Sequence, residues 1–323
     1  KRAKILSRNM ERMAVSNALV TNEHPANLAK KYPGFFDRVL VDAPCSGEGM
    51  FRKEEAAVTD WSQETVEMCA RRQADILNEG AKLLRPGGRL VYSTCTFAPE
   101  ENEGAILRFL ARHPNFTLVP IEVAWGQPGL SYDRIRPFCP DVSVDTDLSY
   151  CRRIFPQHGG EGHFIALLMR DEAEYASTPA PYSYPQNDAN AASAQALYAD
   201  CFSDTPNGRF VTIGEQVRLL PDDLPDCRNL GVLSAGIAIA TVCKNRLEPC
   251  HSVYLATRMN WCSRFIDFAQ DDPQLIAFLH GEEIPCTTQN GWTAVCVHGI
   301  PVGFGKASNG KLKNRYPKGL RLL

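Results

Sequence analysis

Two short apolar runs, each followed by a loop that contains a cysteine, constrain the fold of this chain more than any other feature. The run Val39-Leu40-Val41 leads into DAPCSGEGMFRK at residues 42–53, and the run at 89–93 leads into TCTFAPEEN at 94–102. Short apolar runs that end in turn-forming residues are typical of buried strands. Residues 62–84 between them place apolar side chains at helical spacing. The pattern therefore predicts a strand, a helix and a second strand.

This alternation of strand and helix continues through the first half of the chain. The expected elements are a helix over residues 1–13, strands over 18–21 and 37–41, a helix over 62–84 that stops at Arg85-Pro86-Gly87-Gly88, a strand over 89–93, a helix from Pro99 to about 113, and strands over 116–121 and 163–169. The alternation predicts an α/β fold with a mainly parallel, doubly wound sheet.

A proline-rich stretch at residues 171–188, DEAEYASTPAPYSYPQND, separates the two halves. Beyond it, a helix over 189–202 precedes short apolar runs punctuated by turns, which predicts small domains with much β structure. The expected division is a catalytic domain over 1–172, a linker over 173–188, a small α+β domain over 189–250 and a last domain over 251–323.

Composition excludes several classes of protein. Hydrophobic content of 44% and charged content of 22% are ordinary for a globular chain, and a net charge of −2 leaves only local basic surfaces for nucleic acid. No apolar run approaches the roughly 20 residues of a membrane span, so we expect no membrane partner and a cytoplasmic location. The 12 cysteines include no C-x-x-C pair, which predicts reduced thiols and no metal site.

Cys45 and Cys95 follow the two predicted strands. Neighbouring parallel strands lie about 4.8 Å apart and end at one edge of the sheet, where open α/β sheets bind ligands. Two thiols beside the Asp42 carboxylate suit methylation at carbon 5 of cytosine, a weak nucleophile. A thiolate that adds to carbon 6 activates the ring, Asp42 would hold or protonate ring nitrogen 3, and the second thiol would assist the elimination.

The two cysteine motifs resemble motifs IV and VI of the Nol/Nop/Sun family of RNA 5-methylcytosine methyltransferases. The resemblance extends through LLRPGGRLVYSTCT and EGHFIALLMR to about residue 170, and the C-terminal part, with IPVGFGK and GKLKNRYPKGLR, resembles the bacterial RsmF-type subgroup that modifies 16S ribosomal RNA. It implies that Cys95 is the nucleophile, that Cys45 acts in product release and that Asp42 contacts the base. It also implies a Rossmann-like sheet followed by small α+β and PUA-like domains.

The same resemblance implies S-adenosyl-L-methionine as the cofactor. It assigns cofactor contacts to Asn22, Glu23, Asp42 and Pro44. No glycine precedes Gly34, so the glycine-rich cofactor loop of the family is absent, and we expect a chain that is truncated at its N-terminus and lacks the first strands of the sheet. We therefore expect the full-length protein, with the missing strands and loop, to bind the cofactor.

Basic residues in two segments are the candidates for contact with ribosomal RNA or the small ribosomal subunit. Arg52 and Lys53 follow the first cysteine loop and would touch phosphate. The densest basic segment lies at the C-terminal end, where the family resemblance favours RNA binding over a merely solubilising role. Its candidate residues are Lys306, Lys311, Lys313, Arg315 and Lys318.

Other interpretations stay open. Cys45 follows a proline, as the nucleophile of DNA cytosine methyltransferases does, so Cys45 could attack instead of Cys95. A non-catalytic RNA-binding protein with a decayed methyltransferase domain is a second alternative. Asp42 could simply cap a turn, and Gly47 and Gly49 are expected to be turn positions.

Overall fold

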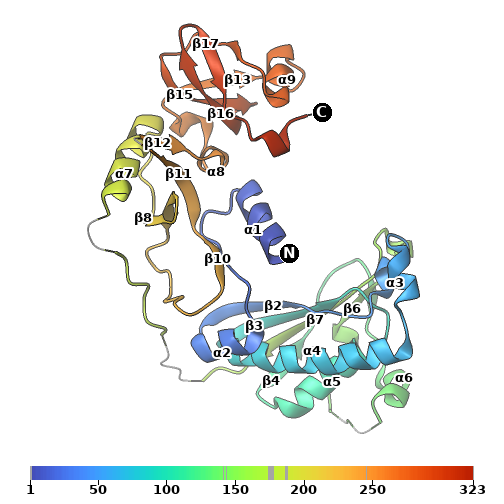
Figure 1. Cartoon of the computed structure of the whole chain (residues 1–323). Coiled ribbons are helices and arrows are strands. Elements are labelled where there is room, and N and C mark those ends of the chain that lie inside the picture. Colours follow the sequence, from blue (N-terminus) through green and yellow to red (C-terminus); the bar gives the residue numbers. More distant parts are fainter. Residues whose placement is uncertain are drawn as a thin grey trace. The chain divides into compact units, whose positions relative to one another are not determined.

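The computed structural model describes residues 2–140, 142, 144–173, 178–185, 188–244 and 246–322. Contacts within the chain define two compact units, which Figure 1 shows in the colours of the sequence. The cysteine unit comprises Glu23–Pro179, and the C-terminal unit comprises Lys1–Asn22 together with Ala180–Leu323. Both cysteine loops belong to the cysteine unit.

The cysteine unit alternates strands and helices up to β4 and continues with short irregular turns. Its elements are α2 (Pro25–Lys31), β2 (Phe36–Asp42), η1 (Glu48–Met50), α3 (Glu55–Thr59), α4 (Gln63–Leu83), β3 (Leu84–Thr94), α5 (Glu103–Arg112), β4 (Phe116–Val119), β5 (Gln127–Pro128), α6 (Tyr132–Ile135), η2 (Arg136–Phe138), η3 (Leu148–Tyr150), β6 (Arg152–Ile154), η4 (Pro156–His158) and β7 (His163–Arg170).

The described strands of this unit form one six-stranded sheet in the order β2-β3-β7-β6-β5, with β4 paired to β7. Strands β2 and β3 are parallel, with Val39 opposite Leu90 and Asp42 opposite Ser93. Strand β7 runs antiparallel to β3, to β4 and to β6. The strand–helix–strand unit β2-α4-β3 is therefore the part of the sheet that brings the two cysteine loops to one edge.

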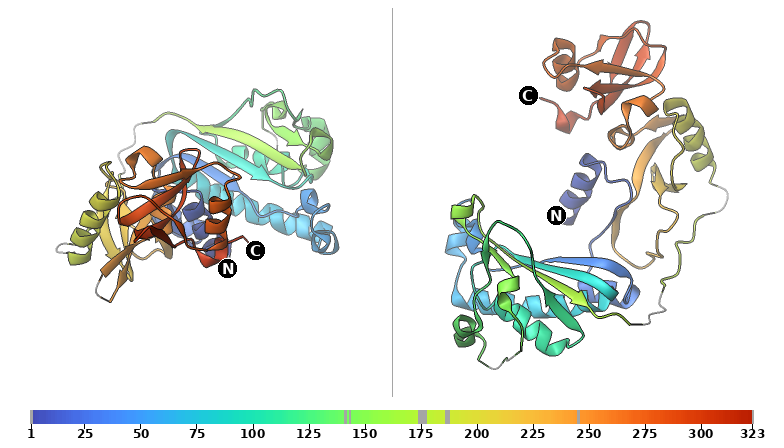
Figure 2. Two further views of the ribbon diagram at one scale, coloured as in Figure 1. Left: turned by 90° about the horizontal axis from the view of Figure 1, so that it is seen from above. Right: turned by 180° about the vertical axis from the view of Figure 1, so that it is seen from behind.

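Helix α4 forms because Ser62 caps its first turn, accepting a hydrogen bond from the Thr65 N–H, and because apolar residues recur on one face. That face packs on the sheet, and Gly80 lets the helix approach the side chains of Val39 and Val41. Figures 1 and 2 show α2, α4 and α5 on the same face of the sheet. The core between these layers includes Leu77, Leu90, Tyr92, Ile106, Phe164 and Leu168, all fully buried.

The expected α/β fold is confirmed, but the expectation of a mainly parallel sheet is wrong for the described strands. Residues 155–162 connect β6 to β7 and are too few for a helical crossover, so β7 is antiparallel to β6, and it also pairs antiparallel with β3 and with β4. Strand β2 lies at the edge of the sheet, and Leu40, on the face away from α4, is 69% exposed.

Two element boundaries also differ from expectation. Strand β3 begins at Leu84, so Arg85-Pro86-Gly87-Gly88 lies inside the strand rather than forming a stop after the helix. Helix α5 begins at Glu103 rather than at Pro99, because Asn102 has a non-helical backbone (φ −101°, ψ −104°) and bonds through its side chain to Thr94 and Thr96. Residues 99–102 form a turn that belongs to the second cysteine loop.

The C-terminal unit is rich in β structure, as the sequence predicts. Its elements are α1 (Arg2–Arg12), β1 (Leu19–Thr21), α7 (Ala189–Cys201), β8 (Arg209–Ile213), β9 (Gln216–Leu220), β10 (Val232–Ala235), β11 (Ile237–Cys243), β12 (Arg246–Pro249), α8 (His251–Leu255), η5 (Met259–Trp261), β13 (Phe265–Phe268), α9 (Pro273–His280), β14 (Ile284–Pro285), β15 (Gly291–Val297), β16 (Ile300–Ser308), β17 (Lys311–Asn314) and η6 (Lys318–Leu320).

These strands form sheets in the orders β12-β11-β9-β8 and β13-β15-β16-β17-β14. Strand β1 is the expected strand over 18–21, but it pairs antiparallel with β10, Leu19 opposite Ala235, and not with the sheet of the cysteine unit. This pairing joins segments more than 200 residues apart in the chain, so the spacing of apolar residues could not reveal it. Of the expected linker, residues 174–177 and 186–187 lie outside the described residues, and the described part is irregular apart from a bridge between Pro181 and Pro225.

Candidate active site

The two cysteine loops leave the sheet side by side. The parallel register of β2 and β3 continues one step beyond the strands, because the Ala43 N–H donates to the Ser93 carbonyl oxygen at 3.0 Å. The loops are joined again further out, where the Gly49 N–H donates to the Cys95 carbonyl oxygen at 2.8 Å. The chain thus places both loops at the carboxyl ends of β2 and β3, as expected for a ligand site in an open sheet.

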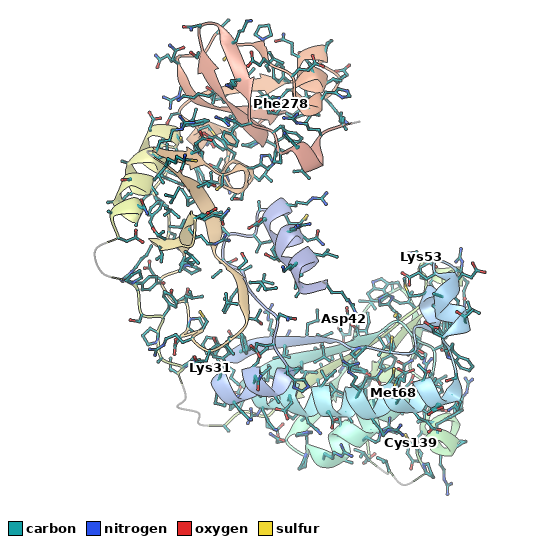
Figure 3. The ribbon with its side chains drawn as sticks, viewed as in Figure 1. Lys31, Asp42, Lys53, Met68, Cys139 and Phe278 are labelled. Carbon is teal, nitrogen blue, oxygen red and sulfur yellow. The ribbon has the colours of Figure 1, made fainter. Side chains whose placement is uncertain are left out.

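The structure brings the predicted thiols together. The Sγ atoms of Cys45 and Cys95 lie 3.3 Å apart, and the Cys95 N–H donates to Cys45 Sγ at 3.4 Å. Both cysteines are free and half-buried. Asp42, labelled in Figure 3, is exposed at the end of β2, where its carboxylate accepts a hydrogen bond from Ser93 Oγ at 3.4 Å.

The two thiols have different acidities. The hydrogen bond from Cys45 lowers the pKa of Cys95 to about 7, although burial and the charges of Asp42 and Glu101 oppose this shift. The hydrogen bond to Cys95, together with burial, raises the pKa of Cys45. The two shifts therefore favour Cys95 as the thiolate and Cys45 as the protonated thiol. A thiolate is the nucleophilic form of cysteine.

Glycines shape the first cysteine loop. Gly47 has φ +76°, a left-handed conformation that favours glycine. At Gly49 a Cβ atom would lie 2.7 Å from the Gly162 carbonyl oxygen and 2.9 Å from that of Cys95. Gly47 is a turn position as predicted, whereas Gly49 lies inside η1 and closely approaches the neighbouring loops of the chain itself.

Sequence reasoning missed a set of buried and half-buried polar side chains in and beneath the two loops. Glu101 lies under the Cys45 loop and accepts hydrogen bonds from Ser46 and Gln73. Glu48 accepts from the Phe97 N–H at 2.6 Å and from Thr96 Oγ1 at 3.0 Å. Acidic residues after a proline are typical of the first turn of a helix, where they are exposed. For this reason the sequence did not indicate that Glu101 is buried.

The residues predicted to bind the cofactor lie in different surroundings. The Asn22 N–H donates to the Gly231 carbonyl oxygen at 2.8 Å within the C-terminal unit. The Glu23 carboxylate accepts from the Asn27 side-chain amide at 2.9 Å. Asp42 and Pro44 are exposed at the end of β2, and the Pro44 carbonyl oxygen accepts from Gln73 Nε2 at 2.9 Å. An exposed carboxylate beside a proline ring at a strand end fits a cationic sulfonium cofactor, so Asp42 and Pro44 stay the stronger candidates.

The basic candidates fall into two groups. Arg52 and Lys53 are exposed between η1 and α3, and Lys53 Nζ lies 3.5 Å from the Glu161 carboxylate (Figure 3). In the C-terminal unit, Lys306 and Lys313 face each other across β16 and β17, and both are exposed. Lys311 and Lys318 are exposed as well, whereas Arg315 is half-buried, with Nη2 3.3 Å from the Glu248 carboxylate.

Trp292 joins this basic group and was not predicted. It pairs with Lys306 in the register of β15 and β16, and Lys306 Nζ lies 5.1 Å from the centre of its ring. Arg315 Cζ lies 5.8 Å from the same ring. A row of residues across three strands, Trp292-Lys306-Lys313, thus presents two lysine charges on one face of the sheet. We call it the lysine row.

The described part of the chain contains neither a group of metal-ligating side chains nor a membrane-spanning helix. Among the residues described, no three His, Cys, Asp or Glu side chains are grouped to hold a metal ion. Within the same residues, every helix is too short or too polar to cross a bilayer.

Comparison with known proteins places the chain in a family. The family description "16S rRNA methyltransferase RsmB/F" matches residues 1–169, which is more than half of the 323 residues. The chain belongs to this family. Two further descriptions match parts of the remaining chain, "RsmF rRNA methyltransferase first C-terminal domain" over 197–256 and "Methyltransferase RsmF PUA domain" over 265–322. The predicted RsmF-type resemblance is confirmed, as is the order of a methyltransferase sheet, a small domain and a PUA-like domain.

Similar proteins include two curated methyltransferases, both named Ribosomal RNA small subunit methyltransferase F. The one from Vibrio campbellii (strain ATCC BAA-1116) is 29% identical over 333 residues, and the one from Shewanella sp. (strain MR-4) is 27% identical over 337 residues. Each match covers 99% of this chain and 67% of the relative. A solved methyltransferase homologue from Pyrococcus horikoshii is 30% identical, with a TM-score of 0.43, over 52% of this chain and 50% of that chain.

Proposed function

We propose that the cysteine unit methylates carbon 5 of a cytosine in 16S ribosomal RNA through a covalent adduct between Cys95 and carbon 6 of the base. Membership of the 16S rRNA methyltransferase family supports the class of reaction and substrate. The observation that carries the cysteine mechanism is the 3.3 Å separation of the Cys45 and Cys95 sulfur atoms at the end of two parallel strands. Methylation of a ring nitrogen or an exocyclic amine would need no such pair.

The first half of the reaction uses Cys95 and Asp42. S-adenosyl-L-methionine, held at the end of β2 by Asp42 and Pro44, would supply the methyl group. The Cys95 thiolate forms a bond to carbon 6, and the ring electrons move toward carbon 5, which makes this carbon nucleophilic. As carbon 6 is attacked, ring nitrogen 3 takes up a proton from solvent, and the Asp42 carboxylate, oriented by Ser93 Oγ, accepts a hydrogen bond from this N–H and stabilises the adduct. Nitrogen 3 returns the proton to solvent when the adduct breaks down.

The second half uses Cys45. Once Cys95 Sγ is bonded to carbon, it can no longer accept the hydrogen bond of Cys45 as a thiolate. The main cause of the raised pKa of Cys45 is then removed. Cys45 can then release its proton to solvent and, as a thiolate, take the proton from carbon 5. The carbon–sulfur bond breaks, Cys95 leaves as a thiolate, and the starting pair is restored. Cys95 thus attacks the base as a thiolate, and Cys45 stays protonated until the adduct has formed.

We also propose that the lysine row binds the phosphate backbone of the RNA. Its support is the exposed pair Lys306 and Lys313 on neighbouring strands of the domain that matches the RsmF PUA description. Such contacts position an RNA without reading its sequence. A target cytosine in paired RNA must also leave its stack to reach Cys95, at a cost of a few kcal/mol.

The test measures 5-methylcytidine by nucleoside mass spectrometry after incubation with S-adenosyl-L-methionine and 16S ribosomal RNA. We expect product with the unchanged protein, none with Cys95→Ala, and a trapped protein–RNA adduct with Cys45→Ala. Cys243→Ala, a half-buried thiol of the C-terminal unit, is the control and should leave the yield unchanged. If Cys45→Ala abolishes product and Cys95→Ala traps the adduct, the two roles are reversed, and methylation of another atom would refute the proposal.

A further inference from the structure

We propose that Glu101 is a positioning residue that holds the Cys45 loop in place, so that the Cys45 thiol stays beside Cys95. The catalytic consequence of this inference rests on the proposed function, whereas the positional claim rests on the contacts of Glu101 alone. Glu101 follows Cys95 by six residues and lies in the turn before α5, with no exposed surface.

The Glu101 carboxylate bonds to both residues that flank Cys45, one directly and one through Gln73. Ser46 donates from its N–H, at 3.1 Å to Oε2, and from its hydroxyl, at 2.5 Å to Oε1. Gln73 Nε2 on α4 donates to Glu101 Oε2 at 2.6 Å and to the Pro44 carbonyl oxygen at 2.9 Å. The backbone on each side of Cys45 is therefore tied to one carboxylate.

Glu101 is itself fixed to the second cysteine loop and to the sheet. The Tyr92 hydroxyl, from β3, donates to the Glu101 carbonyl oxygen at 2.7 Å. The next residue, Asn102, accepts from Thr94 Oγ1 at 2.6 Å and donates to the Thr96 carbonyl oxygen at 3.0 Å, on either side of Cys95. One short segment thus sets the position of both cysteines.

The chemistry of this contact argues against a role in stability alone. The donors to Glu101 are neutral, and within the described residues no lysine or arginine forms an ion pair with it. Burial raises the pKa of Glu101, while the hydrogen bonds from Ser46 and Gln73 oppose the shift. A buried carboxylate without a cationic partner costs stability that apolar packing would not. The Glu101 carboxylate instead holds the backbone of the Cys45 loop in one position through its hydrogen bonds.

A second link joins a carboxylate of the Cys45 loop to the Cys95 loop. We call the contacts of Glu101 and Glu48 together the clamp. Glu48, three residues after Cys45, accepts from the Phe97 N–H and from Thr96 Oγ1, both in the Cys95 loop. Ser46 Oγ also contacts Thr96 Oγ1 at 2.8 Å. The contacts of Glu48 are to residues that follow Cys95 in the chain. Loss of the Glu101 carboxylate therefore releases the backbone beside Cys45, while Glu48 still joins the two loops.

The first test is the pH dependence of Cys95 alkylation by iodoacetamide, followed by peptide mass spectrometry without RNA or cofactor. Cys95 is faced by Cys45, whose hydrogen bond lowers its pKa, and by the charges of Asp42 and Glu101, which raise it. Positioning predicts that Glu101→Gln raises the alkylation midpoint by about one pH unit or more, because Cys45 moves away. A purely electrostatic role predicts a lower midpoint, because a negative charge is removed. A lowered or unchanged midpoint overturns the inference.

Ser46→Ala keeps the carboxylate and removes only the hydroxyl donor, so it tests the clamp in a variant with minimal change to the core. We expect the same direction of shift, and no shift would count against the clamp. Glu100→Gln is the matched control, since the neighbouring Glu100 carboxylate accepts from Gln63 at the surface. It should behave as the unchanged protein.

The second test measures the proximity of the thiols by their disulfide equilibrium with glutathione. Oxidised glutathione accepts the two electrons, the two thiols lose their protons, and two reduced glutathione molecules form with the Cys45–Cys95 bond. A disulfide needs about 2.05 Å between sulfurs, so the 3.3 Å pair requires only a small approach. We expect the equilibrium constant to fall at least tenfold in Glu101→Gln and to stay within twofold in Glu100→Gln. An unchanged constant in Glu101→Gln refutes positioning, even if the chain methylates RNA as proposed.

Discussion

The sulfur atoms of Cys45 and Cys95 lie 3.3 Å apart although 50 residues separate them in the chain. The parallel pair β2–β3 makes this possible, because it delivers both loops to one edge of the sheet. The contact makes the thiols unequal, since each sulfur is the main influence on the pKa of the other. One pair of thiols can therefore provide both a nucleophile and a reserve acid–base group.

Cys45→Ala should raise the pKa of Cys95. The Cys45 hydrogen bond is the main cause that lowers this pKa to about 7, and its loss returns the thiol toward the ordinary value of about 8.5 or above. The rate of Cys95 alkylation by iodoacetamide, followed from pH 5.5 to 9.5, gives the midpoint. Cys69→Ala, on α4, is the control and should leave it unchanged. A Cys95 midpoint that stays near 7 in Cys45→Ala would mean that another group stabilises the thiolate.

The ion pair of Glu103 and Arg153 should be important for stability. Arg153 Nη2 contacts the Glu103 carboxylate while both side chains are almost completely buried, and Arg153 Nη1 donates to the Phe97 carbonyl oxygen in the Cys95 loop. Glu103→Gln leaves a buried guanidinium without its counter-charge, which costs about 3–5 kcal/mol in the free energy of unfolding. Urea denaturation measures the loss. Glu79→Gln breaks the pair with Lys82, whose side chain is exposed while that of Glu79 is half-buried, and should cost less than about 1 kcal/mol. Similar losses in both variants would contradict this account.

The sequence was sufficient to predict the elements around the cysteines. Residues 37–41, 62–84 and 89–93 carry local periodicity, and the structure has β2, α4 and β3 there. The pairing of distant strands could not be predicted, because local sequence patterns do not indicate which strands pair. The partner of β1 is β10, more than 200 residues later in the chain, and β7 pairs with β3 and β4, from which other elements separate it in the chain.

The candidate site shows the same division. Asp42, Cys45 and Cys95 stand out because loops that follow strands rarely carry such residues together. Glu101 and Gln73 do not, because an acid after proline and a glutamine in a helix are ordinary where they stand. Their burial and their bonds to Ser46 and Pro44 are visible only in the folded chain. Trp292 was missed for the same reason.

The lysine row should contribute to RNA affinity through salt-dependent contacts. Replacing both Lys306 and Lys313 by glutamine removes two potential phosphate contacts. The slope of log affinity against log salt concentration should then fall in magnitude by about 1.4 for single-stranded RNA. Fluorescence anisotropy with labelled RNA at several salt concentrations measures this slope. Lys30→Gln, an exposed lysine of α2, is the control, and an equal slope in the double variant would remove the lysine row from the RNA interface.

His251 should make the stability depend on pH. Burial lowers the pKa of His251 to about 4, below its ordinary value near 6.5. The unfolded chain then binds a proton that the folded chain does not, so stability is full above pH 6.5 and falls as the pH drops toward 4. The loss amounts to about 2 kcal/mol between pH 7.5 and 5. Thermal unfolding of His251→Gln across this range should show a smaller decline, whereas the exposed His280→Gln should not differ from the unchanged protein. An undiminished decline in His251→Gln would show that other groups cause it.

The most direct test of the proposed chemistry is to identify the cysteine that bonds to the base. The Cys45→Ala variant is incubated with S-adenosyl-L-methionine and 16S ribosomal RNA, the protein–RNA adduct is isolated under denaturing conditions, and both components are digested for mass spectrometry. We predict a methylated cytosine nucleotide attached to the peptide that contains Cys95. A nucleotide on any other cysteine, or methylated RNA formed by a Cys95→Ala variant, would contradict the account.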